Sequence, residues 1–262
     1  MFVPMQRGRA EVGILIGVLV LSIAGASAEQ PLQLQTEQFF SLPLDGSLTI
    51  DNTDGSIHVF GWYEPRVRVA TLRQAYSEAR LHQIRVETSP GPASLAVRTI
   101  IPSAHRLFAD RSGTVHYTVT APETAQLSLK LANGEISLQG LRGGHAQVEF
   151  VNGRLFLLNC YARVEARSVN GAMDVFFDWW ENLPAAIDFF LQHGRIGARL
   201  PAAARFRVAA RTAQGGIHNG FGFRAATGAG AEQTLGGATA ADPPVSLGLL
   251  TGGGNISIEA IR

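Results

Sequence analysis

A short Asn-Gly phrase recurs along this chain about every twenty residues, and it constrains the fold more than any other feature. Its clearest copies, NGEISL, NGRLFL and NGAMDV, begin at Asn133, Asn152 and Asn170. The key glycines of all copies are Gly55, Gly134, Gly153, Gly171, Gly194, Gly215 and Gly254. From Gly134 onward the gaps are 19, 18, 23, 21 and 39 residues. A near-constant gap with one doubled interval is typical of a repeat architecture.

Apolar residues accompany each glycine at fixed distances, five positions before it and two and four positions after it. Asn219 is the one exception to this pattern. Because alternate residues of a strand share one face, each unit is predicted to be a strand, a tight corner and a second strand with one buried face. Glycine suits the corner because it adopts a positive φ at no steric cost.

The same periodicity fits two arrangements. Asn-Gly between alternating strands also indicates an antiparallel hairpin, and a meander of hairpins would place the same apolar positions on one face. Stacked identical corners require identical residues, so the recurrence of one phrase favours a parallel β-solenoid. The chain is therefore predicted to be all-β, with little helix.

Residues 1–28 have the pattern of a secretory signal peptide. Arg7 and Arg9 precede an apolar run over 12–26, and Ala26-Ser27-Ala28 forms a cleavage site. An uncleaved anchor is the alternative, although a run of 15 residues is short for a membrane span. No second apolar run is long enough to cross a membrane. We expect an exported protein, located in the periplasm, on the cell surface or outside the cell.

Charge and cysteine content limit the kinds of partner and covalent link that the chain can have. Removing the leader takes two Arg and one Glu from 22 basic and 21 acidic residues and leaves 20 of each. A neutral chain has no general electrostatic affinity for nucleic acid or anionic lipid. Cys160 is the single cysteine, which excludes an intramolecular disulfide and is expected to be a buried small hydrophobe.

The chain is predicted to have two parts after the leader. Residues 29–125 form an irregular N-terminal β part that caps the stack, with one short helix over Ala75–Gln83 and Ser77 as its N-cap. Residues 126–262 form the repeat array. Within that array, residues 225–243 are rich in Gly, Ala and Thr and are expected to be a mobile loop that accounts for the doubled gap.

Several of these segments carry a resemblance to a known family. The run DNTDGSIHVFGW over 51–62 resembles the opening strands of the bacterial putative-adhesin family of unknown function (the DUF4097 family). Residues 132–175 are similar to its middle, and 200–201, 206–208, 214–217 and 253–258 are similar to its C-terminal part. The resemblance covers about 39–262. It implies a right-handed β-solenoid-like fold, a cell-envelope location and a non-catalytic, adhesive or accessory role, with no catalytic residues to carry over.

The best candidates for a reactive site are four carboxylates, Asp174, Asp178, Glu181 and Asp188. Glycosidases need paired carboxylates, so a β-helix carbohydrate-active enzyme is one hypothesis. A solvated strand edge and loop is the interpretation that we favour. The seven histidines lack zinc-ligand spacing, and there is no phosphate loop or dinucleotide motif, so no metal or cofactor is expected.

The densest aromatic segment is the other candidate site. Phe177, Asp178, Trp179 and Trp180 lie where the repeat is interrupted and are the predicted ligand or partner contact, although packing of these rings onto the solenoid is favoured. The leading hypothesis is an exported, non-enzymatic cell-envelope protein whose adhesin-like surface binds a cell-surface glycan or an envelope protein. A periplasmic accessory or scaffold protein is the alternative.

Overall fold

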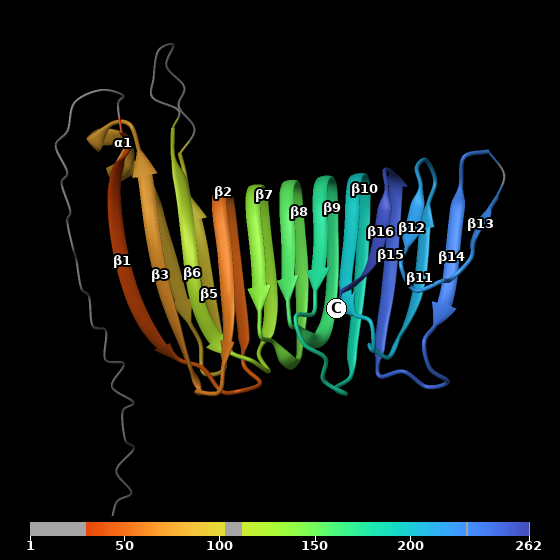
Figure 1. Ribbon diagram of the computed structural model, residues 1–262. Helices are drawn as coiled ribbons and strands as arrows, with labels where there is room; N and C mark the ends of the chain where they lie inside the picture. Colours follow the sequence, from red (N-terminus) through yellow and green to blue (C-terminus); the bar gives the residue numbers. More distant parts are fainter. Residues whose placement is uncertain (1–29, 103–111, 229, 262) are drawn as a thin grey trace, which may run out of the picture.

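The computed structural model describes residues 30–102, 112–228 and 230–261, so the predicted signal peptide at 1–28 lies outside the described residues. Within these ranges the chain forms sixteen strands and one helix, α1 (Glu78–Gln83), and it extends as one long sheet (Figure 1). No helix in the described part of the chain is long and apolar enough to span a membrane.

The centre of the molecule is a stack of five long strands in parallel register. In stacking order they are β2 (Ser47–Trp62), β7 (Gln126–Gln139), β8 (Arg142–Leu158), β9 (Tyr161–Phe176) and β10 (Ala185–Pro201). The key glycine of each strand pairs with the key glycine of the next. We call the part of each strand before this glycine the first arm and the part after it the second arm. The parallel pairing confirms the solenoid-like arrangement and excludes the antiparallel meander.

The seven key glycines lie at the bend between the two arms and have φ values between +130° and +148°. They also stack so closely that each leaves no room for a side chain. A Cβ on Gly153 would lie 1.8 Å from the carbonyl oxygen of Gly134, and a Cβ on Gly171 would lie 1.8 Å from that of Gly153. Glycine is therefore required at each corner for two reasons, its backbone angle and the close approach of the neighbouring strand.

The core lies between the two arms. Alternate residues of each arm point inward, as in Leu129 and Ile136 of β7 and Val148 and Leu155 of β8, and all four are buried. The buried apolar residues of the five stacked strands belong to one hydrophobic cluster. The apolar pattern around the glycines therefore marks the inner face of both arms.

The N-terminal part closes one end of the stack. The second arm of β2 pairs with β6 (Thr114–Pro122), followed by the antiparallel strands β3 (Arg66–Ala75) and β1 (Leu32–Ser41). The first arm of β2 pairs with β5 (Ser94–Ile100), which is covered by β4 (Arg85–Pro90).

The predicted helix is present but shorter than expected. The strand β3 extends to Ala75, and the helix α1 begins at Glu78. Ser77 is its N-cap, and its side chain accepts a hydrogen bond from the backbone N–H of Arg80. Leu81 is buried beneath the helix.

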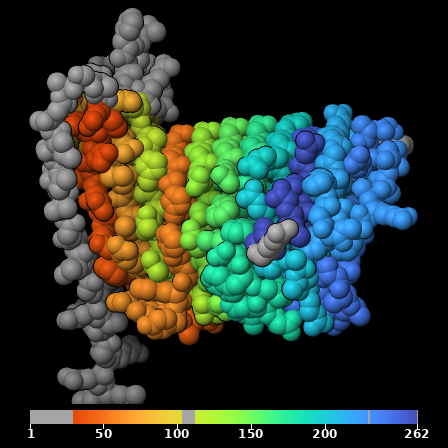
Figure 2. All heavy atoms as spheres, in the orientation of Figure 1, coloured from red at the N-terminus to blue at the C-terminus, as the bar shows by residue number. Residues whose placement is uncertain are grey.

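The C-terminal coils do not stack in sequence order. Next to β10 lie β15 (Val245–Gly253) and β16 (Ile256–Ile261), and outside them lie β11 (Phe206–Thr212) and β12 (Ile217–Asn219). Figure 2 shows the dark-blue final strands between the teal of β10 and the lighter blue of the preceding segments. The glycine stack continues through this exchange, because Gly254 packs on Gly194 and Gly215 packs on Gly254.

The segment 225–243, which is expected to be a mobile loop, contains two short strands. This segment contains β13 (Ala225–Thr227) and β14 (Gln233–Ala238), and β14 pairs antiparallel with β11. Leu235 is the one large side chain of β14 that is buried. A single buried position produces no periodicity, which is why the sequence pattern does not reveal the strand.

Candidate ligand-binding face

The outer face of the first arms carries side chains in straight rows, because the strands are in register. One row, which we call the charged row, contains Asp51, Lys130, Glu149, Arg167, Phe190, Leu250 and Arg211, each on the strand next to the one before. Its first four members alternate in charge, and Lys130 forms an ion pair with Glu149 at 3.0 Å. Neighbouring positions in such a row are about 4.8 Å apart.

A neighbouring row, two residues earlier in each of the parallel strands and two residues later in the antiparallel β14, contains a run of residues with almost no side chain. Gly248, Ala209 and Gly236 are adjacent across β15, β11 and β14. Their neighbours in the charged row are bulky, and the result is a groove of about 710 Å³ that we call the wide groove. Two carboxylates of the same row, Glu165 and Asp188, lie at its β9–β10 end.

A second groove, the narrow groove, runs on the other side of the charged row. It measures about 530 Å³ and is lined in part by Lys130, Glu149 and Val151. Arg167 and Phe190 line both grooves, so these two side chains of the charged row lie between them. The fractional exposures of Val151, Phe190 and Leu250 are 45%, 40% and 37%, which is high for large apolar side chains. This outer face, with its two grooves, is the grooved face.

The two carboxylates of the wide groove differ in their electrostatic surroundings. Burial raises the pKa of Asp188, and the negative charge of Glu165 raises it further. The carboxylate lies over Gly248, where a Cβ would be 2.2 Å from Asp188 Oδ1. The Arg163 Nε donates a hydrogen bond of 2.9 Å to Glu165 Oε1 and lowers the pKa of that carboxyl.

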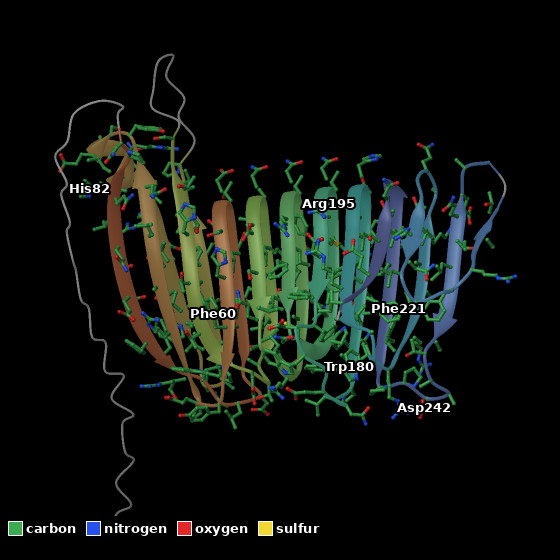
Figure 3. All side chains as sticks on the ribbon, in the orientation of Figure 1. Phe60, His82, Trp180, Arg195, Phe221 and Asp242 are labelled. Atoms are coloured by element: carbon green, nitrogen blue, oxygen red, sulfur yellow. The ribbon has the colours of Figure 1, made fainter. Side chains whose placement is uncertain are left out.

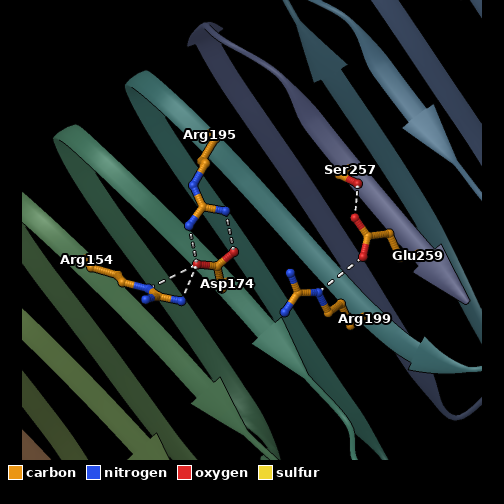
Figure 4. A network of polar contacts seen from close by, with 6 residues as sticks. All are labelled: Arg154, Asp174, Arg195, Arg199, Ser257 and Glu259. Carbon is orange, nitrogen blue, oxygen red and sulfur yellow. Dashed lines mark hydrogen bonds and ion pairs between the residues drawn. The ribbon is translucent and has the colours of Figure 1, made fainter. Parts of the chain in front are cut away.

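Asp174 does not join these carboxylates, because it lies on a second arm and therefore on the opposite outer face. Arg154 Nη2 approaches Asp174 Oδ2 at 3.1 Å, and Arg195 Nη1 approaches Asp174 Oδ1 at 3.2 Å (Figure 4). Gly197 on the next strand leaves room for this carboxylate. The side chain is only 13% exposed, so two arginines hold it as part of the fold rather than in an open site.

Glu181 and Asp178 lie in the turn between β9 and β10. Glu181 accepts a hydrogen bond of 2.6 Å from Arg142 Nη2 and one of 2.8 Å from Trp179 Nε1. These bonds lower the pKa of Glu181. The four carboxylates of the candidate reactive group are therefore distributed over two faces and a turn. In the described part of the chain, no three His, Cys, Asp or Glu residues gather in a way that would hold a metal ion.

The turn between β9 and β10 contains Phe177, Trp179 and Trp180. It lies at the edge of the stack opposite the glycine corners (Figure 3). Phe177 is fully buried, and its ring lies 5.0 Å from Tyr161 and 5.5 Å from Trp180. Phe177 is therefore inaccessible to a ligand. Trp180 is partly buried, whereas Trp179 is 50% exposed and Asp178 is also exposed. Of the four predicted contact residues, only Asp178 and Trp179 are well placed at the surface.

Sequence reasoning missed the grooved face. The small residues of the wide groove come from three strands whose order in space differs from their order in the chain. Phe190 alternates with buried Phe189 and Leu191, which signals its outward direction, but nothing in the sequence places it beside Leu250.

No protein-family model matches the chain, and no curated protein matches it. Among solved structures, a putative cell adhesion protein from Clostridium sporogenes is 13% identical with a TM-score of 0.47, covering 88% of this chain and 100% of that chain. A putative lipid binding protein from Parabacteroides distasonis is 7% identical with a TM-score of 0.29, covering 86% and 96%. A putative adhesin from Parabacteroides merdae is 7% identical with a TM-score of 0.23, covering 87% and 96%. These values are too low to assign the chain to a family.

Proposed function

We propose that this chain is an exported, non-enzymatic protein of the cell envelope that binds its ligand on the grooved face. The observation that carries this proposal is the presence of two neighbouring grooves, both lined by Arg167 and Phe190, on a face where three large apolar side chains are exposed. Apolar exposure concentrated on one face is typical of an interaction site. Cell-surface glycans and envelope proteins are the partners that we propose.

The rows of the grooved face suit an extended ligand. A ligand lying along the wide groove crosses the strands and meets Asp188, Gly248, Ala209 and Gly236 in turn. The small residues of the floor accept an apolar surface, and the adjoining row offers an aromatic ring at Phe190 and charged groups for hydrogen bonds.

Binding is tested by substitutions that change only exposed side chains. We expect Phe190→Gln with Leu250→Gln to weaken binding to arrays of bacterial envelope polysaccharides or to intact envelopes by tenfold or more, since exposed apolar anchors dominate such contacts. Trp179→Gln is the control, because it removes an exposed apolar side chain from the turn between β9 and β10. Loss of binding in Trp179→Gln alone would instead assign the contact to the turn that contains Asp178 and Trp179.

The export part of the proposal rests on the signal-peptide pattern at 1–28 and has its own test. An epitope-tagged chain is followed in its native cell by protease treatment of intact cells and by osmotic release of the periplasm. Digestion on intact cells supports a surface protein. Protection from protease, together with osmotic release, supports the periplasmic accessory role, and retention in the cytosol contradicts export.

A second function, cleavage of a polysaccharide, is favoured by one observation. Glu165 and Asp188 are neighbours on adjacent strands, and their pKa values are shifted in opposite directions. Opposite shifts of two carboxyls are typical of a general acid and its ionised partner. This function ranks second because Glu165 already accepts a hydrogen bond from Arg163. A polysaccharide-degrading activity that is abolished by both Asp188→Asn and Glu165→Gln would establish it over simple binding.

A further inference from the structure

The described sheet has four terminal edges, and they differ in how well they are protected. At the N-terminal end the edge strands are β4 and β1, and at the C-terminal end they are β13 and β12. The strands β12 and β13 have only three residues each, and β4 has six residues ending at Pro90. Short strands and proline protect an edge from pairing with another chain.

The strand β1 lacks all of these protections. It has ten residues, contains no Pro, Gly or Lys, and pairs in unbroken register with β3 along its full length. Among the described residues β3 is its only strand partner, and within that part of the chain no strand pairs with the backbone groups on its other side.

Exposed apolar side chains gather at both ends of this edge. Eight large hydrophobic residues are exposed in the described structure, and four of them adjoin β1. Leu32 begins the strand, and Tyr76 directly follows its pairing partner Ala75. Leu44 and Tyr63 lie in the turns at the opposite end. Concentration of exposed apolar surface at both ends of one open edge indicates a contact surface rather than scattered exposure.

We infer that β1 pairs antiparallel with β1 of a second copy of this chain and joins two sheets into one. Antiparallel pairing about a two-fold axis brings the Leu32–Tyr76 end of one copy against the Leu44–Tyr63 end of the other. Self-complementarity of this kind is what a two-fold interface requires, and it selects a second copy over an unrelated partner.

The two axes through a residue at the middle of β1 pass through Thr36 and Glu37, and the charge of Glu37 selects between them. An axis through Thr36 places Thr36 opposite itself, Gln35 opposite Glu37 of the partner subunit, and Leu32 opposite Phe40 of the partner subunit. Residues that lie opposite each other then have numbers that are both odd or both even. Their side chains therefore share a face, and the core faces of both copies lie on the same side of the joined sheet. An axis through Glu37 would instead oppose two like charges, which is unfavourable.

The inference is tested with the purified chain by analytical ultracentrifugation across micromolar concentrations, because a contact made by one strand pair is small and its affinity modest. We expect a reversible monomer–dimer equilibrium. Gln35 is exposed and lies opposite Glu37 of the partner subunit, so Gln35→Glu should weaken association and Gln35→Lys should strengthen it. The two-fold axis repeats the contact between residues 35 and 37, so each substitution changes two contacts. Their combined effect corresponds to about a two- to thirtyfold change in the dissociation constant.

The control is Ala226→Glu and Ala226→Lys on β13, an exposed position on an edge at the other end of the molecule. Neither control should change the association. A chain that remains monomeric at every concentration overturns the inference. A dimer for which Gln35→Glu and Gln35→Lys have equal effects, or which responds to the Ala226 variants, also overturns it. Failure of ligand binding on the grooved face leaves it unaffected, because β1 lies at the opposite end of the stack from the wide groove.

Discussion

The corner glycines are the residues with the least freedom to change. Gly153 combines a φ of +144° with a neighbouring carbonyl oxygen 1.8 Å from the position of an added Cβ. We expect Gly153→Ala to lower the free energy of unfolding by more than about 3 kcal/mol, because both the backbone angle and the packing are violated. Urea denaturation of the purified variant measures this loss.

Gly143 provides the matched control for that substitution. Its φ is +77°, but an added Cβ would meet nothing within 4 Å. Gly143→Ala should therefore cost only about 1–2 kcal/mol, the cost of the backbone angle alone. Equal losses in the two variants would show that stacking of the corners contributes nothing beyond the backbone angle.

The buried hydroxyl of Tyr117 should make the stability of the protein depend on pH in the alkaline range. Burial raises its pKa to about 12, and its hydroxyl lies 2.6 Å from Thr99 Oγ1. Between pH 10 and 12 the unfolded chain releases this proton and the folded chain keeps it, so the free energy of unfolding falls as pH rises. The slope contributed by one such group is at most about 1.4 kcal/mol per pH unit.

Comparison with Tyr117→Phe isolates this contribution. The variant loses stability at neutral pH, because the Thr99 hydroxyl is left without its buried partner, but its stability should decline less between pH 10 and 12. Unfolding in urea at pH 9, 10, 11 and 12 tests the prediction. Parallel curves for the two proteins would contradict it.

Cys160 shows how burial suppresses reactivity. Burial raises the pKa of this thiol to about 11, and Sγ lies 3.3 Å from the carbonyl oxygen of Leu138. We expect no alkylation by iodoacetamide in the folded protein at pH 8 and rapid alkylation in urea, because the thiolate is the reacting form. Fast modification of the native chain would show that the turn beside Cys160 opens readily.

At the scale of the element, an amide ladder connects the corners. Asn133 Nδ2 donates to Asp54 Oδ1 at 2.8 Å, Asn152 Nδ2 donates to Asn133 Oδ1 at 2.9 Å, and Asn170 Nδ2 donates to Asn152 Oδ1 at 3.0 Å. Every bond runs toward β2. A carboxylate can only accept, so it fits the first position, where Asp54 stands, and no later one.

This direction predicts an asymmetry between two substitutions. Asn152→Asp removes a donor from the middle of the ladder and should cost about 1 kcal/mol at pH 7. Asp54→Asn keeps the accepting oxygen and should be nearly neutral. Thermal unfolding of both variants at pH 7 and at pH 3 measures the difference, and protonation at pH 3 should recover part of the loss in Asn152→Asp. A larger loss in Asp54→Asn would contradict the direction of the ladder.

The elements that the sequence predicts well are those with a local signal. The corners and the inner faces follow from spacing around each glycine, and α1 follows from Ser77 and Leu81. The wide groove has no local signal, because Asp188 meets Gly248 sixty residues later, across strands whose order in space differs from their order in the chain. The hairpin of β13 and β14 was missed for a similar reason, since its strand pairing is supported by a single buried Leu235.

At the scale of the whole molecule, β15 holds the C-terminal part to the stack. Leu247 lies between Ile187 of β10 and Val208 of β11 and is buried. We expect Leu247→Asp to detach β11 to β14, because coils of a stack are stabilised mainly by their nearest neighbours. Hydrogen exchange should show protection lost over 206–238 and 245–261 and retained over 126–176. Ser246→Asp, on the outward side, is the control, and uniform loss of protection would contradict local detachment.

The position of β15 and β16 has a consequence for the order of events during synthesis. A growing chain produces β11 and β12 before β15 and β16, yet the earlier pair lies farther from β10. In the folded chain Gly254 packs on Gly194, and Gly215 packs on Gly254. The final arrangement cannot arise by adding coils in order of arrival. In the final order β15 and β16 pair directly with β10, and β11 and β12 pair with this later pair instead, so this end of the stack is not assembled in the order of the chain.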